Sequence, residues 1–271
     1  MVNRTPVDDT AFAQIAEIYQ YDPDLSLDAV TIGSWSARMP YTIDKVIYTS
    51  THGERIPGHF AYPGVDRPGP HPAILLVHGA NSFWGRNEDW ALDWLDILAR
   101  AGYCVLCIDN ADHGERMTSP SRKGKAGSYS HREWMVQSVT DQRRGVDYLR
   151  TRPEVDEQRI LLFGGSLGGW IGCLVAGLDN RFAAVVLTVI GAWVEGATDD
   201  ARTRWVNMLN FAPRLQAPTL MVNATGDGRE LGEELFSHLP EPRQQLWIES
   251  SHYLPPREHN VEILNWLAAL P

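Results

Sequence analysis

Arg159-Ile-Leu-Leu-Phe-Gly-Gly-Ser-Leu-Gly-Gly-Trp170 begins as a short apolar strand, turns at a run of glycines and continues as an apolar helix. Ser166 lies at this junction between Gly164 and Gly168, which fits the G-x-S-x-G strand–turn–helix motif that exposes a serine hydroxyl above a sheet. The two glycines lack Cβ atoms, so strand and helix can cross closely while the serine adopts a strained backbone. Ser166 is therefore a candidate nucleophile, and a flexible glycine loop is the alternative.

Apolar runs with strand-like and helix-like periods alternate from about residue 44 to the end of the chain. This alternation is typical of an α/β fold, with a mostly parallel sheet and helices on both faces. Eight strands are expected, at Lys45–Ser50, Ile56–Tyr62, Ala73–His78, Tyr103–Asp109, Ile160–Gly164, Ala183–Val189, Thr219–Asn223 and Gln245–Ile248. Helices are expected at Asn87–Ala101, His131–Arg152, Leu167–Leu178, Arg229–Leu239 and Arg257–Ala269. The turn at His52-Gly53 predicts that the first two strands form an antiparallel pair at one edge.

The N-terminal forty residues are expected to form a helical extension (1–40) ahead of the main domain (41–271). Residues 8–20 place apolar side chains at helical spacing, namely Phe12, Ile15, Ile18 and Tyr19. This extension could pack on the edge of the sheet, shape the mouth of a pocket or mediate a dimer contact. The segment 191–215, between the sixth and seventh strands, is long enough for a small cap of one or two helices.

The composition indicates one globular α/β domain of 271 residues, of which 44% are hydrophobic and 21% charged. No apolar run approaches the ~18 residues that a membrane span needs, and the N-terminus has no hydrophobic signal region, so we expect a cytoplasmic protein without membrane contact. The net charge of −10 argues against nucleic acids and polyanions as partners. Cys104, Cys107 and Cys173 are expected to be buried, reduced thiols without a disulfide.

A serine hydroxyl needs a base to take its proton and an acid to orient that base. The seventh predicted strand leaves through a Gly-Asp turn at Asp227, and the eighth is followed directly by His252. Asp227 would fix the tautomer of His252, which would deprotonate Ser166. The alternative acids are Asp199 and Asp200. The alternative bases are His238, near a helix end, and His259, which we expect to be a solvated residue in the first turn of the last helix.

The reaction of such a serine also needs hydrogen-bond donors for the developing oxyanion. The backbone N–H of Leu167 can supply one, because free N–H groups at the start of a helix favour negative charge. The third predicted strand ends in His78-Gly79, where glycine lets the loop turn its amides inward. Ala80 N–H is therefore the expected second donor, with Asn81 as the fallback. His78 should pin the loop by hydrogen bonding.

A family resemblance follows from the order of these residues. The set His78-Gly79-Ala80, Gly164-x-Ser166-x-Gly168-Gly169, Asp227 and His252 resembles the α/β-hydrolase superfamily over residues 44–271. The loop Asp109-Asn-Ala-Asp-His-Gly-Glu-Arg116 is similar to the D-x-x-x-H-G-E-R loop of dienelactone-hydrolase-like esterases and prolyl-oligopeptidase-related hydrolases. Dienelactone hydrolases carry a cysteine where this chain has Ser166. The resemblance therefore implies an α/β-hydrolase fold and favours cleavage of simple carboxylic esters through an acyl-enzyme intermediate, without a cofactor.

The charged residues of that loop have two readings. Asp112, His113, Glu115 and Arg116 could hold a metal ion. One histidine with carboxylates in a glycine turn more often forms a hydrogen-bonded brace in which an arginine neutralises an acid. We expect the brace, with no metal bound.

The substrate-binding candidates are Asn81, Trp84, Trp170 and Trp193, which lie in or near loops on the side of the candidate nucleophile. Aromatic walls suit apolar or aromatic substrate groups, although tryptophans are mostly packing residues. The expected partner is a small-molecule ester. Formation of a homodimer is left as an open question. Two other functions remain as alternatives: cleavage of a C–C, lactone or amide bond by the same three residues, and a non-catalytic binding protein.

Overall fold

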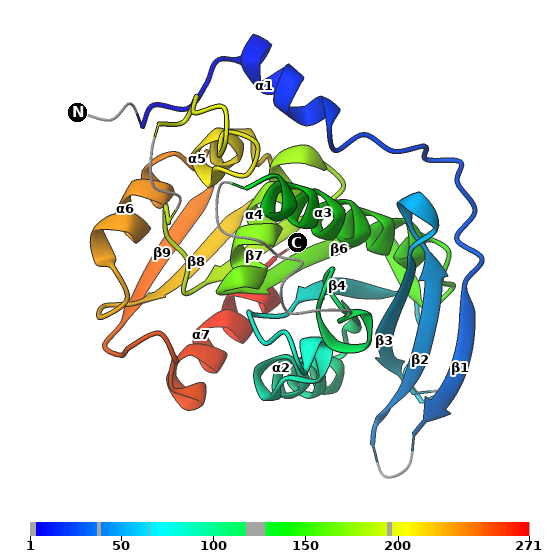
Figure 1. Cartoon of the computed structure of the whole chain (residues 1–271). Coiled ribbons are helices and arrows are strands. Elements are labelled where there is room, and N and C mark those ends of the chain that lie inside the picture. Colours follow the sequence, from blue (N-terminus) through cyan, green and yellow to red (C-terminus); the bar gives the residue numbers. More distant parts are fainter. Residues whose placement is uncertain (1–3, 37–38, 65, 118–127, 194–196, 271) are drawn as a thin grey trace.

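A nine-stranded sheet forms the centre of the computed structural model, which describes residues 4–36, 39–64, 66–117, 128–193 and 197–270 (Figure 1). The strand order is β1-β2-β3-β5-β4-β6-β7-β8-β9. The strands are β1 Val30–Trp35, β2 Tyr41–Thr49, β3 Arg55–Pro63, β4 His71–Val77, β5 Cys104–Ile108, β6 Val155–Gly165, β7 Ala184–Thr188, β8 Thr219–Ala224 and β9 Arg243–Ile248. Strands β4 to β9 pair in parallel, whereas β1, β2, β3 and β5 pair antiparallel in that order. The expected α/β architecture is confirmed.

The prediction of eight strands was wrong by one, because β1 adds a ninth strand outside the hairpin formed by β2 and β3. This hairpin turns at Thr51–Gly53, as expected, yet it is not the edge of the sheet. Nearly all side chains of β1 are exposed, and its pairing register shifts between Thr31 and Gly33. Such a strand lacks the alternation of buried and exposed residues by which strands are recognised.

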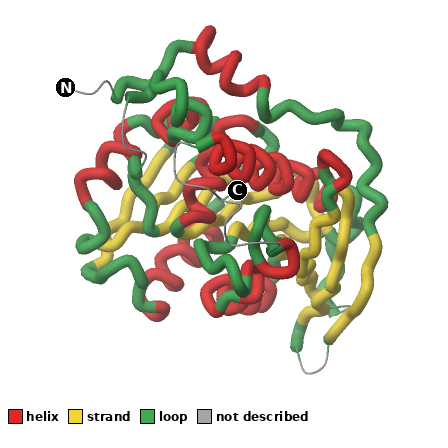
Figure 2. The backbone as a smooth tube through the Cα atoms, viewed as in Figure 1, coloured by secondary structure: helices red, strands yellow, loops and turns green. Residues whose placement is uncertain are grey.

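Helices cover both faces of the sheet. They are α2 Asp89–Ala101, α3 Tyr129–Arg150, α4 Leu167–Leu178, α6 Arg229–Ser237 and α7 Pro256–Ala268. Figures 1 and 2 show α3 and α4 on one side of the sheet and α2 and α7 on the other. Successive side chains of β4 serve the two sides in turn, because Leu75 packs in the core beneath α3 and α4 while Leu76 packs in the core beneath α2 and α7.

The N-terminal segment contains one helix, α1 at Asp9–Glu17, whose first turn is capped by the carboxylate of Asp8. The ring of Phe12 packs edge-to-face on Phe211 at 5.3 Å between centroids. Phe211 ends helix α5, Met208–Phe211, which lies in the segment expected to form a small cap. The extension is not wholly helical, because its later part forms β1. The division into extension, cap and main domain stays a prediction.

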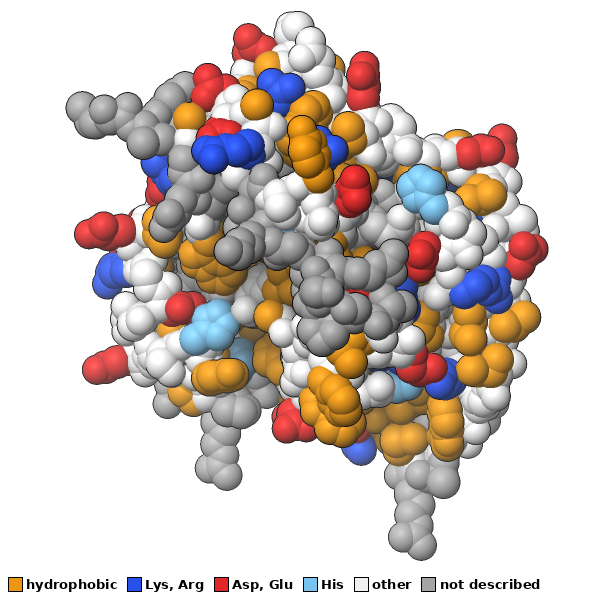
Figure 3. Space-filling view, in the orientation of Figure 1, with side chains coloured by type: hydrophobic (Ala, Val, Ile, Leu, Met, Phe, Trp, Pro, Cys, Tyr) orange, Lys and Arg blue, Asp and Glu red, His pale blue; other side chains and the backbone are white. Residues whose placement is uncertain are grey.

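Two further sequence expectations concern thiols and membrane spans. All three cysteines are buried and free, as predicted. Within the described residues, no helix is both long enough and apolar enough to cross a bilayer. On the face shown in Figure 3, acidic and basic side chains are interspersed with apolar ones.

Candidate active site

Ser166 lies between β6 and α4 with φ 55° and ψ −121°, a backbone conformation that L-residues rarely adopt. Its N–H donates to the carbonyl oxygen of Thr188 at 2.9 Å. A Cβ atom on Gly164 would lie 2.2 Å from the carbonyl oxygen of Gly168, and one on Gly168 would lie 2.0 Å from that of Val77. Close packing of backbone against backbone therefore requires both glycines. The segment is a fixed strand–turn–helix junction and not a flexible glycine loop.

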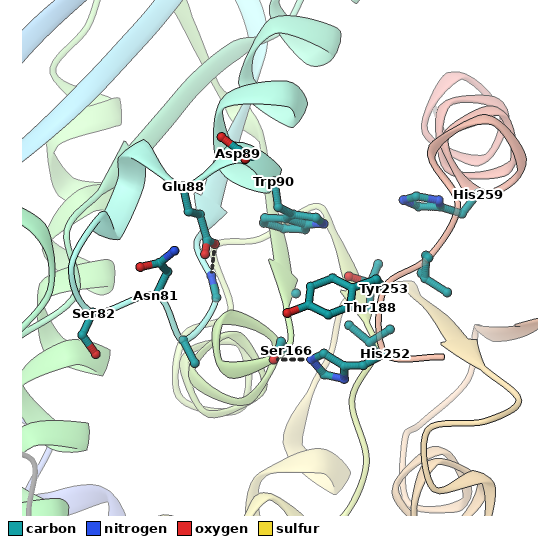
Figure 4. Close-up of a pocket in the computed structure, with 15 residues that line it drawn as sticks. Asn81, Ser82, Glu88, Asp89, Trp90, Ser166, Thr188, His252, Tyr253 and His259 are labelled. Atoms are coloured by element: carbon teal, nitrogen blue, oxygen red, sulfur yellow. Dashed lines mark hydrogen bonds between the residues drawn. The ribbon is translucent and has the colours of Figure 1, made fainter. Parts of the chain in front are cut away.

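Three side chains meet in one hydrogen-bonded chain at the carboxyl end of the sheet. Nε2 of His252 lies 2.9 Å from Oγ of Ser166, and Nδ1 of His252 lies 2.7 Å from Oδ2 of Asp227 (Figure 4 shows the first bond). A carboxylate can only accept, so Nδ1 donates and Nε2 is left to accept from the serine hydroxyl. Asp227 follows β8 and His252 follows β9, at the expected places. The structure thus brings the three predicted residues together, and their catalytic roles stay predictions.

The alternative acids and bases lie elsewhere. Asp200 is bonded to Arg202 at 2.8 Å, and this hydrogen bond lowers the pKa of Asp200 to about 2. Among the described residues, no contact joins His252 to Asp199 or Asp200. The expectation of a solvated His259 was wrong, because this ring is only 3% exposed and packs edge-to-face on Trp94 at 5.8 Å. His238 follows the last residue of α6 and is half-buried there.

The loop after β4 is held from two sides. Nε2 of His78 accepts from the N–H of Asn110 at 3.0 Å, and its Nδ1 lies 2.8 Å from the carbonyl oxygen of Gly79. The carboxylate of Glu88 accepts from the N–H of Gly79 at 2.5 Å. Burial raises the pKa of Glu88, and the Gly79 bond opposes this shift. The side chains of His78 and Glu88 therefore hold the two peptide units on either side of the Gly79 Cα atom.

The two expected oxyanion donors flank Ser166. Ala80 follows Gly79 and lines the same cavity as Ser166. Leu167 begins α4 immediately after the serine, so its N–H lies in the first turn of that helix. Their role as donors stays a prediction.

A buried ionic network braces the loop after β5; it consists of Arg86, Asp109, Arg116 and Asp141, and the exposed Glu115 pairs with Arg86 at its edge. Arg86 bonds to both Asp109 and Glu115. Asp109 also accepts from the N–H groups of Arg86 and Glu115, at 2.8 and 2.9 Å. Arg116 donates to Asp141 at 2.7 Å. Because each buried charge has a counter-charge, the loop has the character of the expected brace.

In the described part of the chain, the geometry of this loop does not support the alternative of a metal site. His113 lies with Nδ1 2.8 Å from the carbonyl oxygen of Ala111. Within the described ranges, no group of three or more His, Cys, Asp or Glu side chains has the arrangement of a metal site.

A cavity of about 530 Å³ opens beside Ser166. It is lined by Gly79, Ala80, Asn81, Ser82, Glu88, Asp89, Trp90, Gly165, Ser166, Thr188, Val189, His252, Tyr253, Leu254 and His259 (Figure 4). A Cβ on Gly165 would lie 2.6 Å from Cζ2 of Trp90, so the indole packs directly on the backbone that precedes the nucleophile. The wall therefore combines the loop after β4, the start of α2, the end of β7 and the segment that leads into α7.

Of the predicted substrate-binding residues, Asn81 lines the cavity. Trp84 is 54% exposed and packs edge-to-face on Phe83, outside this lining. The indole N–H of Trp170 donates to the carbonyl oxygen of Val206 at 2.8 Å, also outside the lining. The ring centroid of Trp193 lies 6.2 Å from that of His252, at the edge of the site.

Sequence reasoning missed several lining residues, namely Glu88, Trp90, Tyr253, Leu254 and His259. Tyr253 and Leu254 were accessible to it, because they follow His252 directly. Trp90 was accessible too, since it starts the helix that follows the His-Gly loop. Nothing local marks His259, whose position depends on how α7 docks against α2.

Comparisons with known proteins agree with this geometry. A sequence model described as the alpha/beta hydrolase family matches residues 74–270. The chain is 28% identical over 149 residues to the "Putative hydrolase YtaP" of Bacillus subtilis (strain 168), a match that spans 49% of this chain and 48% of that protein. It is 22% identical over 232 residues to the "Uncharacterized protein YfhR" of Escherichia coli O157:H7, spanning 79% and 75% of the two chains.

Solved structures share the fold along nearly the whole chain. An acetyl xylan esterase from Paenibacillus sp. R4 superposes with a TM-score of 0.77 at 21% identity, covering 99% of this chain and 96% of that one. Acetyl xylan esterase 1 from Thermoanaerobacterium sp. JW/SL YS485 gives a TM-score of 0.76 at 17% identity, with 98% and 95% covered. Since the matched region holds the serine turn and the histidine that follows the last strand, the chain belongs to the α/β-hydrolase family.

Proposed function

We propose that this protein is a serine hydrolase that cleaves carboxylic esters of small molecules through an acyl-enzyme intermediate. The observation that carries the proposal is the continuous chain from Ser166 Oγ through the His252 ring to the Asp227 carboxylate, at 2.9 and 2.7 Å. This chain borders a cavity of about 530 Å³, which suits a small molecule. Several proteins of similar fold are esterases, which favours an ester as the substrate.

The first half of the reaction acylates the serine. Nε2 of His252 takes the hydroxyl proton as Oγ of Ser166 attacks the carbonyl carbon of the ester. The electron pair of the C=O bond moves to the oxygen, and the N–H groups of Ala80 and Leu167 stabilise this oxyanion. The pair then returns, the bond to the alcohol oxygen breaks, and His252 gives its proton to the departing alkoxide. Asp227 stabilises the imidazolium throughout.

The second half hydrolyses the acyl-enzyme. His252 removes a proton from a water molecule, whose oxygen attacks the carbonyl carbon of the acylated serine. Collapse of the second oxyanion breaks the bond to Oγ of Ser166, which takes the proton back from His252. The products are the carboxylic acid and the free enzyme, and the scheme requires no cofactor.

Hydrolysis of short-chain p-nitrophenyl esters tests the nucleophile. In Ser166→Ala, we expect turnover to fall by a factor of at least about 10⁴, because the covalent intermediate cannot form. The matched control is Ser237→Ala, which removes a serine hydroxyl on α6 and should leave turnover unchanged. Near-native thermal unfolding of both variants would show that the loss is chemical. Persistent hydrolysis in Ser166→Ala would remove the proposal.

A second experiment separates the proposal from the other functions. An organophosphonate should form a covalent adduct on Ser166, detected by mass spectrometry of the peptide that contains it. Such an adduct would exclude a non-catalytic binding protein. A panel of matched ester, lactone, amide and C–C substrates should give the highest kcat/KM with the ester, and a higher value for another bond would move the assignment to that bond.

A further inference from the structure

His259 is a polar side chain on the cavity wall that the proposed reaction does not use. It lies in the first turn of α7 and is 3% exposed. Its ring packs edge-to-face on Trp94 of α2, at 5.8 Å between centroids. Figure 4 shows the ring reaching from α7 toward Trp90, on the side of the cavity opposite Glu88. It therefore lines the same cavity as Ser166, and the hydrogen bond of its ring is not to the proposed triad of Ser166, His252 and Asp227.

The hydrogen bonds of this ring determine what it can offer a ligand. Nδ1 lies 2.6 Å from the carbonyl oxygen of Pro255. A carbonyl oxygen only accepts, so Nδ1 must carry the hydrogen and donate it. Burial lowers the pKa of His259, which keeps the ring neutral near pH 7. Nε2 consequently holds a lone pair and no hydrogen, so it can accept a hydrogen bond and cannot donate one.

This acceptor has no partner within the described part of the chain. The neighbouring wall is largely apolar, because Trp90 and Leu254 contribute indole and alkyl surface. A plain alkyl group placed against Nε2 would exclude water and leave the acceptor unsatisfied, which is unfavourable. A ligand hydroxyl would restore the lost hydrogen bond. The site therefore discriminates between ligands by whether they carry a donor at this point.

We propose that Nε2 of His259 accepts a hydrogen bond from a hydroxyl group of the substrate, so that the preferred substrates are hydroxyl-bearing esters. This inference rests on the proposed ester hydrolysis and names its substrate class. The hydroxyl can belong to the acyl half or to the alcohol half of the ester. Both halves lie in the same cavity when the ester carbonyl is at Ser166. Trp94 packs edge-to-face on the ring and holds it in place, and Trp90 supplies aromatic surface on the cavity wall.

Two pairs of esters of equal size test the preference and locate the hydroxyl. The acyl pair is ethyl 3-hydroxybutyrate and ethyl 3-methylbutyrate. The alcohol pair is 2-hydroxypropyl butyrate and 2-methylpropyl butyrate. In each pair a methyl group replaces the hydroxyl, so the ratio of the two kcat/KM values reports the donor rather than the size. Wild type should prefer the hydroxyl ester in at least one pair.

His259→Phe removes the acceptor and keeps a flat ring against Trp94. The preference should fall by about three- to tenfold, which is the value of one neutral hydrogen bond. His259→Gln keeps an acceptor and should restore part of the preference. His238→Phe is the matched control, because His238 lies outside the cavity, and it should leave the ratio unchanged. A ratio that is equal in wild type and His259→Phe, or a wild type without preference in either pair, overturns the inference.

Binding without turnover separates this inference from the proposed function. Calorimetry on Ser166→Ala should show tighter binding of the hydroxyl ester than of its methyl partner, and Ser166→Ala/His259→Phe should lose the difference. A retained binding preference in a protein that hydrolyses no ester would remove the proposed function and support the His259 assignment. If the protein hydrolyses esters and His259→Phe changes neither measurement, the proposed function stands and the His259 assignment is overturned.

Discussion

Two chains of charged and polar groups lie near the candidate active site, and they differ in their exposure to solvent. In the triad, the side chains of His252 and Asp227 are 37% and 23% exposed. In the buried ionic network, those of Arg86 and Asp109 are 1% and 0% exposed. Both chains are hydrogen-bonded, so bonding alone does not distinguish a reactive site from a structural one. Access does: Ser166 and His252 line a cavity, whereas the Arg86–Asp109 pair is closed to solvent and holds the loop after β5.

The largest expected effect falls on the triad and concerns activity. His252→Ala should lower the turnover of a p-nitrophenyl ester by about 10⁴- to 10⁶-fold, because the base is lost. Its free energy of unfolding should change by less than about 1 kcal/mol, since the side chain is partly exposed. Enzyme assays and urea unfolding on the same preparation check both values. Asp227→Asn should lower turnover by about 10⁴-fold, because the tautomer of His252 is no longer fixed.

The buried ionic network should show the opposite behaviour. Asp109→Asn removes the buried charge that faces Arg86 and leaves the buried guanidinium with only the exposed Glu115 as its counter-charge. The free energy of unfolding should fall by about 3–5 kcal/mol, measured by urea unfolding. The control is Asp156→Asn, which breaks a surface pair with Arg159 and should cost less than about 1 kcal/mol. Equal losses of unfolding free energy in Asp109→Asn and Asp156→Asn would show that the buried network is no more important for stability than a surface pair.

The same network should influence the response to acid. Burial, and after it the charge of Arg86, lowers the pKa of His59 from 6.5 to about 4. The unfolded chain therefore takes up a proton at this histidine before the folded protein does. The stability contributed by neutral His59 is present above about pH 6.5 and is lost as the pH falls to about 4. His59→Gln should reduce the acid-induced loss of unfolding free energy by about 2–3 kcal/mol over this window.

The smallest expected effect lies between the two regions, at Glu88. This carboxylate holds the N–H of Gly79, one residue before the proposed oxyanion donor Ala80. Glu88→Ala should lower kcat by about ten- to a hundredfold with a smaller change in KM, because the loop shifts without losing the triad. Glu88→Gln keeps an oxygen acceptor and should recover most of the rate. If KM alone changed, Glu88 would be a residue that binds substrate and not one that positions the loop.

The sequence predicted those features that depend on local patterns and chain order. The serine turn was visible in Gly164, Ser166 and Gly168, because steric fit at a strand–helix crossing needs glycine. Asp227 and His252 were visible because parallel strands all end at the same edge of the sheet, which brings residues that follow them together. The antiparallel hairpin was marked by its glycine turn.

Features that depend on tertiary packing escaped prediction. Strand β1 is mostly exposed and carries a register shift, so it has no hydrophobic period. His259 looked like a surface residue because the start of a helix is often solvated, yet the docking of α7 on Trp94 buries it. The positions of the tryptophans depend on packing in the same way: Trp90 lines the cavity, whereas the N–H of Trp170 donates to the carbonyl oxygen of Val206. The substrate-binding roles of Trp84, Trp170 and Trp193 stay predictions.

Ser166 and His252 lie far apart in the sequence, and this spacing has a consequence while the ribosome synthesises the chain. Ser166 and its base are 86 residues apart, and the base comes second. At roughly 5–20 residues per second, the ribosome adds His252 about 4–17 s after the nucleophile. The nascent chain therefore carries the proposed nucleophile for seconds before its proposed base has been added. On the proposed mechanism, hydrolysis can begin only late in translation, after β9 has joined the sheet and His252 lies beside Ser166.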